Sequence, residues 1–302
     1  MRNARTIRGA RKAPAAVLLT GALLFAAGCS GSGADGETAG AGAPDSTIAP
    51  RSSSLTGDLA LPVEGYIFSE SELGLLTRAM NTLARDCMKR SGFDYRPDET
   101  PTPDIGVMDR RYGIANAYTA ATYGYHFPSP KTGRANTREL GEAGRVALSG
   151  RPLKDGTLNP DGGCVGEAKR RLAGTSDAFG PDKLARELNL ESYVRSQKDP
   201  RVLAVFRSWS SCMADRGYRY GSPMEAIDDP GFGSARTGPA EISTARADVE
   251  CKKKTGLVRT WFDVESGMQR AEIDKNAEEL ARIKRHKTDQ LKRAASEVGE
   301  SR

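Results

Sequence analysis

Between residues 69 and 92, apolar residues recur every three or four positions, which is the spacing of one helix face. The members of this face are Leu73, Leu76, Met80, Leu83 and Cys87. Ser69 and Glu72 form a capping-box signature at its start, and Gly92 stands where the helix would end. A second face begins after Asp199 and Pro200, a typical helix-start pair. Its members are Val202, Val205, Phe206, Trp209 and Cys212. We therefore expect an all-α, mainly helical protein.

The two predicted helices end in the same short motif. Residues 87–95 read CMKRSGFDY, and residues 212–220 read CMADRGYRY. Four of the nine positions are identical, and the seventh is aromatic in both. An internal duplication explains this match better than chance similarity between two helix ends.

The C-terminal part continues the helical spacing from Leu257 to about Val298, with a shift in phase near Ile273. This predicts one long helix, or two helices in line. The second half is rich in cations: Arg282, Lys284, Arg285, Lys287, Lys292 and Arg293. The simplest interpretation is a solvated helix face, and the alternative is an arm that binds a partner helix or anionic lipid.

The N-terminus has the pattern of an export signal. Five cations precede an apolar run from Ala13 to Ala27, and small residues lead from there to Cys29. The run of about 15 residues is shorter than the ~20 that span a bilayer. The cysteine resembles the lipid-attachment site of bacterial lipoproteins, so we expect it to anchor the chain to the membrane. Ala26 stands where those signals favour Leu, and the alternative is ordinary cleavage that leaves a secreted protein.

The overall charge of +6 is misleading as a guide to partners. The first 28 residues contain five of the 45 cations and none of the 39 acids, which leaves 40 cations against 39 acids. A nearly neutral mature chain provides no electrostatic basis for a nucleic-acid partner.

Four cysteines follow Cys29, and outside the cytoplasm we expect them to oxidise in pairs. Spacing alone leaves three connectivities open. The duplication favours pairing within each unit, Cys87 with Cys164 and Cys212 with Cys251, and each bridge would contribute about 4 kcal/mol. A metal site is disfavoured because no Cys-x-x-Cys is present and the chain has only two histidines. We expect no metal and no cofactor.

The segment from Tyr112 to Pro130 is rich in aromatic residues. It contains Tyr112, Tyr118, Tyr123, Tyr125, His126 and Phe127. Aromatic faces suit sugars and peptides, which makes these residues a candidate ligand surface. The simpler interpretation is a small satellite core under a long loop.

These patterns divide the chain into five parts. We expect a signal peptide at 1–28, a disordered tether at 29–60, and a first helical unit at 61–180 that includes the aromatic insert. A bridging helix and the second unit follow at 181–262, and the C-terminal helix occupies 263–302.

The paired Cys-Met-x3-Gly-aromatic motifs, residues 199–202 (DPRV), residues 251–258 (CKKKTGLV) and the lipoprotein-like leader together resemble a group of secreted actinobacterial lipoproteins. The resemblance implies an extracytoplasmic location and disulfide bonds. It implies no activity and no site residues.

The chain contains no nucleophile-elbow, zinc-protease, phosphate-loop or dinucleotide signature. We therefore expect a lipid-anchored, non-enzymatic envelope protein that binds a protein or a cell-wall component. The alternative is a cell-wall hydrolase that uses paired carboxylates, which leave no short motif. A thiol oxidoreductase is disfavoured because no cysteine has a partner two residues away.

Overall fold

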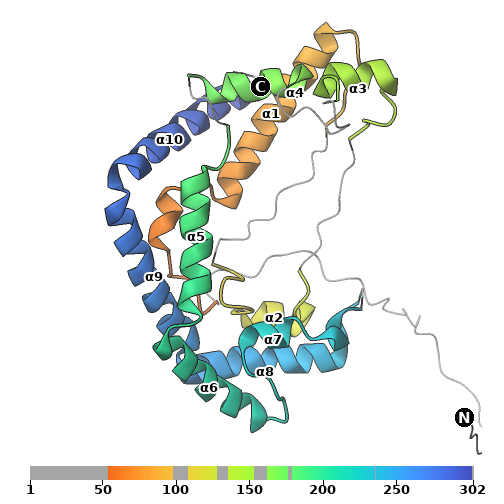
Figure 1. The fold of residues 1–302 in the computed structure, drawn as a ribbon. Helices are drawn as coiled ribbons and strands as arrows, with labels where there is room; N and C mark the ends of the chain where they lie inside the picture. Colours follow the sequence, from red (N-terminus) through yellow and green to blue (C-terminus); the bar gives the residue numbers. More distant parts are fainter. Residues whose placement is uncertain are drawn as a thin grey trace, which may run out of the picture. The chain divides into compact units, whose positions relative to one another are not determined.

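The computed structural model describes residues 54–97, 108–127, 135–152, 162–175, 179–234 and 236–300. The expected signal peptide, Cys29 and the tether up to residue 53 lie outside these residues, as do Pro128 and Pro130. Within the described ranges the chain forms ten α-helices and no strand, which confirms the all-α class (Figure 1). None of these helices is both long enough and apolar enough to cross a bilayer.

The helices range in length from five to 24 residues. In chain order the helices are α1 (Glu70–Arg90), α2 (Ala117–Tyr123), α3 (Gly141–Ser149), α4 (Gly163–Ala173), α5 (Lys183–Ser196), α6 (Pro200–Ala214), α7 (Pro223–Ile227), α8 (Pro239–Thr255), α9 (Leu257–Lys275) and α10 (Ala277–Glu300). Two single 3-10 turns, η2 (Pro62–Gly65) and η3 (Pro230–Phe232), complete the set.

The helix starts follow the local signals in the sequence. At α1, the Glu72 amide donates to Ser69 Oγ at 3.2 Å, and the Ser69 amide donates to Glu72 Oε2 at 2.7 Å. At α6, the Asp199 carboxylate accepts from the Arg201 amide at 2.9 Å, and Pro200 takes the first helical position. Each side chain satisfies a backbone donor that the first helical turn leaves without a partner.

The two copies of the repeated motif end their helices with the same geometry. Gly92 and Gly217 take φ values of +82° and +87°, a conformation that costs other residues about 1–2 kcal/mol. In each copy the following aromatic residue donates its amide to the carbonyl of the methionine five positions earlier. The distances are 2.9 Å to Met88 and 3.0 Å to Met213, and both methionines are fully buried. This pattern is a Schellman-type helix end.

Each unit contains one disulfide. Cys87 at the end of α1 is bonded to Cys164 on α4, and Cys212 at the end of α6 is bonded to Cys251 on α8. The Cα–Cα distances are 5.5 Å and 5.7 Å, within the usual range. These are the pairs that the internal duplication favours.

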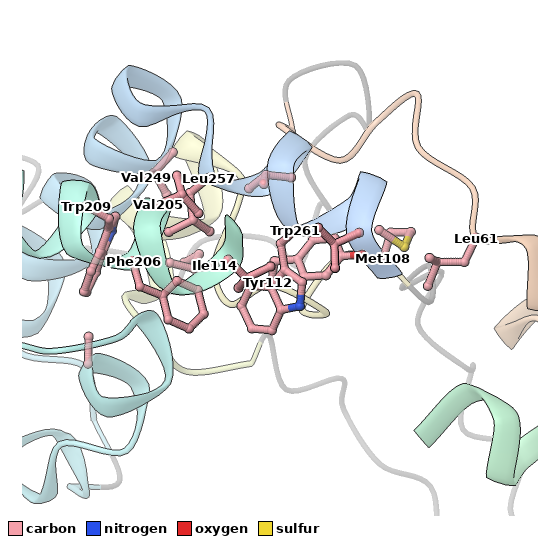
Figure 2. Close-up of a cluster of buried hydrophobic side chains, with 14 of the residues drawn as sticks. Leu61, Met108, Tyr112, Ile114, Val205, Phe206, Trp209, Val249, Leu257 and Trp261 are labelled. Carbon is pink, nitrogen blue, oxygen red and sulfur yellow. The ribbon is translucent and has the colours of Figure 1, made fainter. Parts of the chain in front are cut away.

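The larger hydrophobic core does not follow the expected boundary at residues 180 and 181. It combines residues 61–67 and 108–125 with α5, α6, α8, α9 and the start of α10. The ring of Trp261 lies 4.9 Å from that of Tyr112 and 5.0 Å from that of Phe206, measured between centroids (Figure 2). The aromatic insert, expected in the first unit, therefore packs in the core of the second.

The chain before η2 also belongs to this core. The Leu55 amide donates to the Ala115 carbonyl at 3.0 Å, and the Leu55 and Leu59 side chains pack against the buried cluster. The disordered tether expected at 29–60 therefore does not include residues 55–59, because Leu55 and Leu59 pack against the larger core.

Two smaller clusters surround α1. One contains Leu76, Leu172 and Ala294 from α1, α4 and α10, and the other surrounds the Cys87–Cys164 bridge between α1, α3 and α4. The C-terminal part is two helices, because α9 ends at Lys275 and α10 begins at Ala277. The helix expected at 263–302 is therefore the second half of α9 followed by α10.

The charged face of α10 is only partly solvated, which corrects the expectation for that run of cations. Lys287 Nζ donates to the Ile67 carbonyl at 2.6 Å and lies 2.8 Å from Glu72 Oε2 on α1. Arg293 donates to two carbonyls at the end of α4, each at 2.6 Å. A cation at a helix C-terminus satisfies carbonyls that have no intrahelical partner. The exposed members of the run are Arg282, Lys284, Arg285 and Lys292.

Candidate functional site

The residues of the candidate ligand surface do not share one surface. Tyr112 and Tyr125 are 0% and 6% exposed, whereas Tyr118 and Phe127 are 44% and 57% exposed, and Tyr123 is intermediate. The satellite core is also wrong as an interpretation, because both buried tyrosines belong to the larger core. Among these residues, Tyr118 and Phe127 have exposed rings. The Arg110 guanidinium lies 4.6 Å from the centroid of the Phe127 ring.

The hydroxyl of each buried tyrosine donates a hydrogen bond to a buried carboxylate. On α9, Glu265 is fully buried and forms a salt bridge with Arg111, which is 11% exposed. The same carboxylate accepts from Tyr112 Oη at 2.9 Å, Ser192 Oγ at 3.2 Å and Gln269 Nε2 at 3.3 Å. Burial, followed by the Glu265 charge, raises the pKa of Tyr112 far above its ordinary value, so this hydroxyl keeps its proton and remains a donor.

A second network surrounds Asp248 on α8. Lys252, one turn later and also fully buried, places its Nζ 3.0 Å from Asp248 Oδ2 and 2.9 Å from the Ile114 carbonyl. Trp209 Nε1 donates to Asp248 Oδ1 at 2.9 Å, and Tyr125 Oη donates to Oδ2 at 3.3 Å. Burial raises the pKa of Asp248 and lowers that of Lys252, and the attraction between the two charges opposes both shifts.

A third cluster centres on Glu241, near the start of α8 and 2% exposed. Its Oε1 lies 2.7 Å from His126 Nδ1 and accepts from the Tyr125 amide at 2.7 Å. His126 Nε2 lies 2.8 Å from the Ser234 carbonyl. A carboxylate and a carbonyl only accept hydrogen bonds, so this arrangement favours the protonated imidazole, in which both ring nitrogens donate. The hydrogen bond to Glu241, followed by the one to Ser234, raises the pKa of His126, while burial and the Arg110 charge oppose this rise.

Together these groups attach one segment to two helices. Residues 110–126 provide Arg111, Tyr112, Tyr125 and His126, and α8 and α9 provide the three carboxylates. Glu241 and Asp248 are seven positions apart on α8, which places them on the same helix face. The three carboxylates hold this segment in place, because each accepts hydrogen bonds from donors within it.

None of the three carboxylates was among the functional residues expected from the sequence. The sequence did show acidic residues at core positions of apolar helix faces. A single sequence, however, does not show which other segment covers such a face. Among the described residues, no group of three or more His, Cys, Asp or Glu side chains is placed to bind a metal.

A small pocket lies between residues 66–68, the start of α5, and α10. Its polar groups already have partners within the chain. Lys287 bonds to the Ile67 carbonyl, and Gln290 Oε1 accepts from the Gly180 amide at 2.9 Å. The pocket therefore provides little hydrogen-bonding capacity for a ligand.

Comparisons with protein-family models, curated proteins and solved structures gave no match to this chain.

We expect Lys252→Met to lower the free energy of unfolding by about 3–5 kcal/mol, because it leaves the Asp248 carboxylate buried without its cation. Removing that charge as well, with Asp248→Asn, should recover part of the loss. Chemical unfolding in urea measures both changes. Arg259 and Asp263 on α9 form a control pair with the same spacing but are 70% and 54% exposed. Arg259→Met should cost less than about 1 kcal/mol, and equal losses at the two sites would contradict the structural role of the buried pair.

We expect the stabilising effect of His126 to fade as the pH rises. Its pKa in the folded protein lies above the ordinary value of 6.5, so the added stability is complete below that value. It disappears as the pH passes through the raised pKa. The measurement is the difference in unfolding free energy between the wild type and His126→Gln from about pH 5 to pH 9. A difference that stays constant or grows over this range would show that His126 is not held as an imidazolium.

Proposed function

We propose that this chain is a lipid-anchored extracytoplasmic protein that binds a partner at the cell envelope. The observation that carries the location is the pair of interior disulfides, Cys87–Cys164 and Cys212–Cys251. Such bonds persist in oxidising compartments and are rare in reducing ones. The basic and apolar leader that ends at Cys29 supports the same location.

The proposed lipid anchor would let the folded part lie at a distance from the membrane. A diacylglyceryl group on Cys29 would supply two acyl chains, enough for stable anchoring without a spanning helix. The chain from Cys29 to Ser53 is rich in Gly, Ala, Ser and Thr. A flexible linker of this length has an end-to-end distance of about 25–30 Å, which would allow the folded part to reach a neighbouring envelope component.

Binding is favoured over hydrolysis by the roles of the buried acids. A carboxylate-dependent glycosidase needs two carboxyl groups about 5–9 Å apart that face the substrate. Glu241, Asp248 and Glu265 instead lie inside the larger core, each with donors from the chain around it. No observation in the described residues favours the hydrolase over the binding protein.

The exposed apolar side chains are the candidate contact points. Leu190 and Val194 lie one turn apart on α5 and are 62% and 43% exposed. Phe127 has the more suitable chemistry, because its ring is 57% exposed and lies over the Arg110 guanidinium. Rigid aromatic anchors of this kind dominate many binding interfaces.

We expect metabolic labelling with an alkyne-tagged fatty acid to mark the wild-type protein but not Cys29→Ser. The wild type should fractionate with membranes, and the variant should appear in the soluble fraction or the medium, because only the thioether lipid holds the chain. Immunoblots of both fractions complete the measurement. Unchanged membrane association of Cys29→Ser would refute the lipid anchor.

We expect a photo-crosslinking amino acid at Phe127 to capture one discrete partner on intact cells. The matched control is the same group at Thr288, an exposed residue on α10. A binding surface at Phe127 predicts an adduct of defined mass there and none at Thr288. If both positions give no adduct, or the same diffuse adducts, the proposal of a binding surface at Phe127 fails even if Cys29 is lipidated.

A further inference from the structure

The two disulfides occupy equivalent places in the duplicated units but have opposite charges beside them. Each joins the end of a helix that carries the Cys-Met-x3-Gly motif to a later helix. Each also lies next to an arginine–glutamate ion pair, Arg90 with Glu167 and Arg216 with Glu250. The two ion pairs are oriented in opposite ways relative to the sulfur atoms.

In the second unit the cation is next to the bridge. Arg216 Nη1 lies 2.9 Å from Cys212 Sγ and 3.2 Å from Cys251 Sγ, and it also donates to the Cys212 carbonyl at 3.2 Å. Glu250 is on the outer side of the pair, 3.6 Å from Arg216 Nη2 and 62% exposed. A guanidinium in contact with both sulfurs stabilises negative charge on either of them.

In the first unit the anion is next to the bridge. Glu167 Oε2 lies 3.4 Å from Cys87 Sγ, and its other oxygen accepts from Arg90 at 2.6 Å. A carboxylate at this distance disfavours negative charge on Cys87, and it also repels a thiolate that approaches the bridge. The reversed orientation of this arginine–glutamate pair therefore opposes reduction of the Cys87–Cys164 bridge.

We propose that Cys212–Cys251 is a reducible disulfide, opened by an extracytoplasmic dithiol reductant before Cys87–Cys164. Solvent exposure does not explain such an order. Cys87 and Cys164 are 7% and 3% exposed, whereas Cys212 and Cys251 are 4% and 0% exposed, so access alone would favour the first bridge. The charge beside each bridge predicts the reverse, because a thiolate leaves faster as its pKa falls.

The reaction is an ordinary thiol–disulfide exchange. A reductant thiolate attacks Sγ of Cys212, the more exposed of the two residues. The Cys212–Cys251 bond then breaks with release of the Cys251 thiolate beside Arg216. The second thiolate of the reductant then attacks the reductant sulfur in the mixed disulfide and releases Cys212. The reductant becomes a disulfide, its two electrons reduce the cysteine pair, and its two protons become available to the new thiols.

Opening this bridge would remove the covalent link between the end of α6 and α8 while leaving α1 joined to α4. Asp248 and Lys252 flank Cys251 on α8, and Trp209 precedes Cys212 on α6. The released bond therefore lies directly beside the Asp248 network that holds residues 110–126. The protein is the substrate of the reductant in this proposal and not a thiol catalyst.

The test is differential alkylation of the folded protein in graded dithiothreitol, with each cysteine quantified by mass spectrometry. We expect Cys212 and Cys251 to become labelled at least about tenfold faster than Cys87 and Cys164. Arg216→Gln should remove most of that difference, and Arg216→Lys, which keeps the charge, should retain much of it. Glu167→Gln should separately accelerate reduction of Cys87–Cys164.

Two controls separate this effect from unfolding. Circular dichroism, measured before reductant is added, tests whether each variant keeps its helix content. In guanidinium chloride the ion pairs are lost, and the two bridges should be reduced at similar rates. Faster reduction of Cys87–Cys164 in the native wild type would overturn the proposal. So would an undiminished rate difference between the two bridges in Arg216→Gln. If that variant does not fold, an unchanged rate of Cys87–Cys164 reduction in Glu167→Gln would have the same effect.

Discussion

The attachment of residues 110–126 to α8 and α9 is the interaction on which the larger core depends. Asp248 and Glu265 are fully buried. Asp248 binds the Lys252 ammonium and the Tyr125 hydroxyl, and Glu265 binds the Arg111 guanidinium and the Tyr112 hydroxyl. A buried carboxylate without such partners would strongly destabilise the fold. The segment and the two helices therefore form as one unit, and this places Tyr112 against Trp261 in the centre of the core.

The C-terminal helices connect this core to the smaller clusters around α1. Trp261 on α9 and Leu280 at the start of α10 belong to the larger core, and Ala294 further along α10 packs with α1 and α4. Lys287 and Arg293 add hydrogen bonds to carbonyls where other elements end. A helix that appears strongly charged in sequence thus has a packed face, because long cationic side chains pack through their stems and bond through their ends.

The two motif copies share their local geometry and differ in their electrostatics. The two motif copies share the positive-φ glycine, the buried methionine and the disulfide at the helix end. The charged neighbours of the sulfurs differ, with Arg216 beside one bridge and Glu167 beside the other. Backbone geometry constrains the helix end closely, whereas side chains on its surface are free to diverge, so two bridges of common design acquire different chemistry.

The sequence by itself determined the features that depend on nearby residues or on the repeat: the all-α class, the cap at Ser69, the helix end at Gly217 and the preferred disulfide pairing. Only the tertiary structure decided where the aromatic insert packs and which charges are buried. Helical periodicity identifies an apolar face but not the segment that covers it. The bond between Lys252 and the Ile114 carbonyl joins positions 138 residues apart, and no local pattern encodes such a contact.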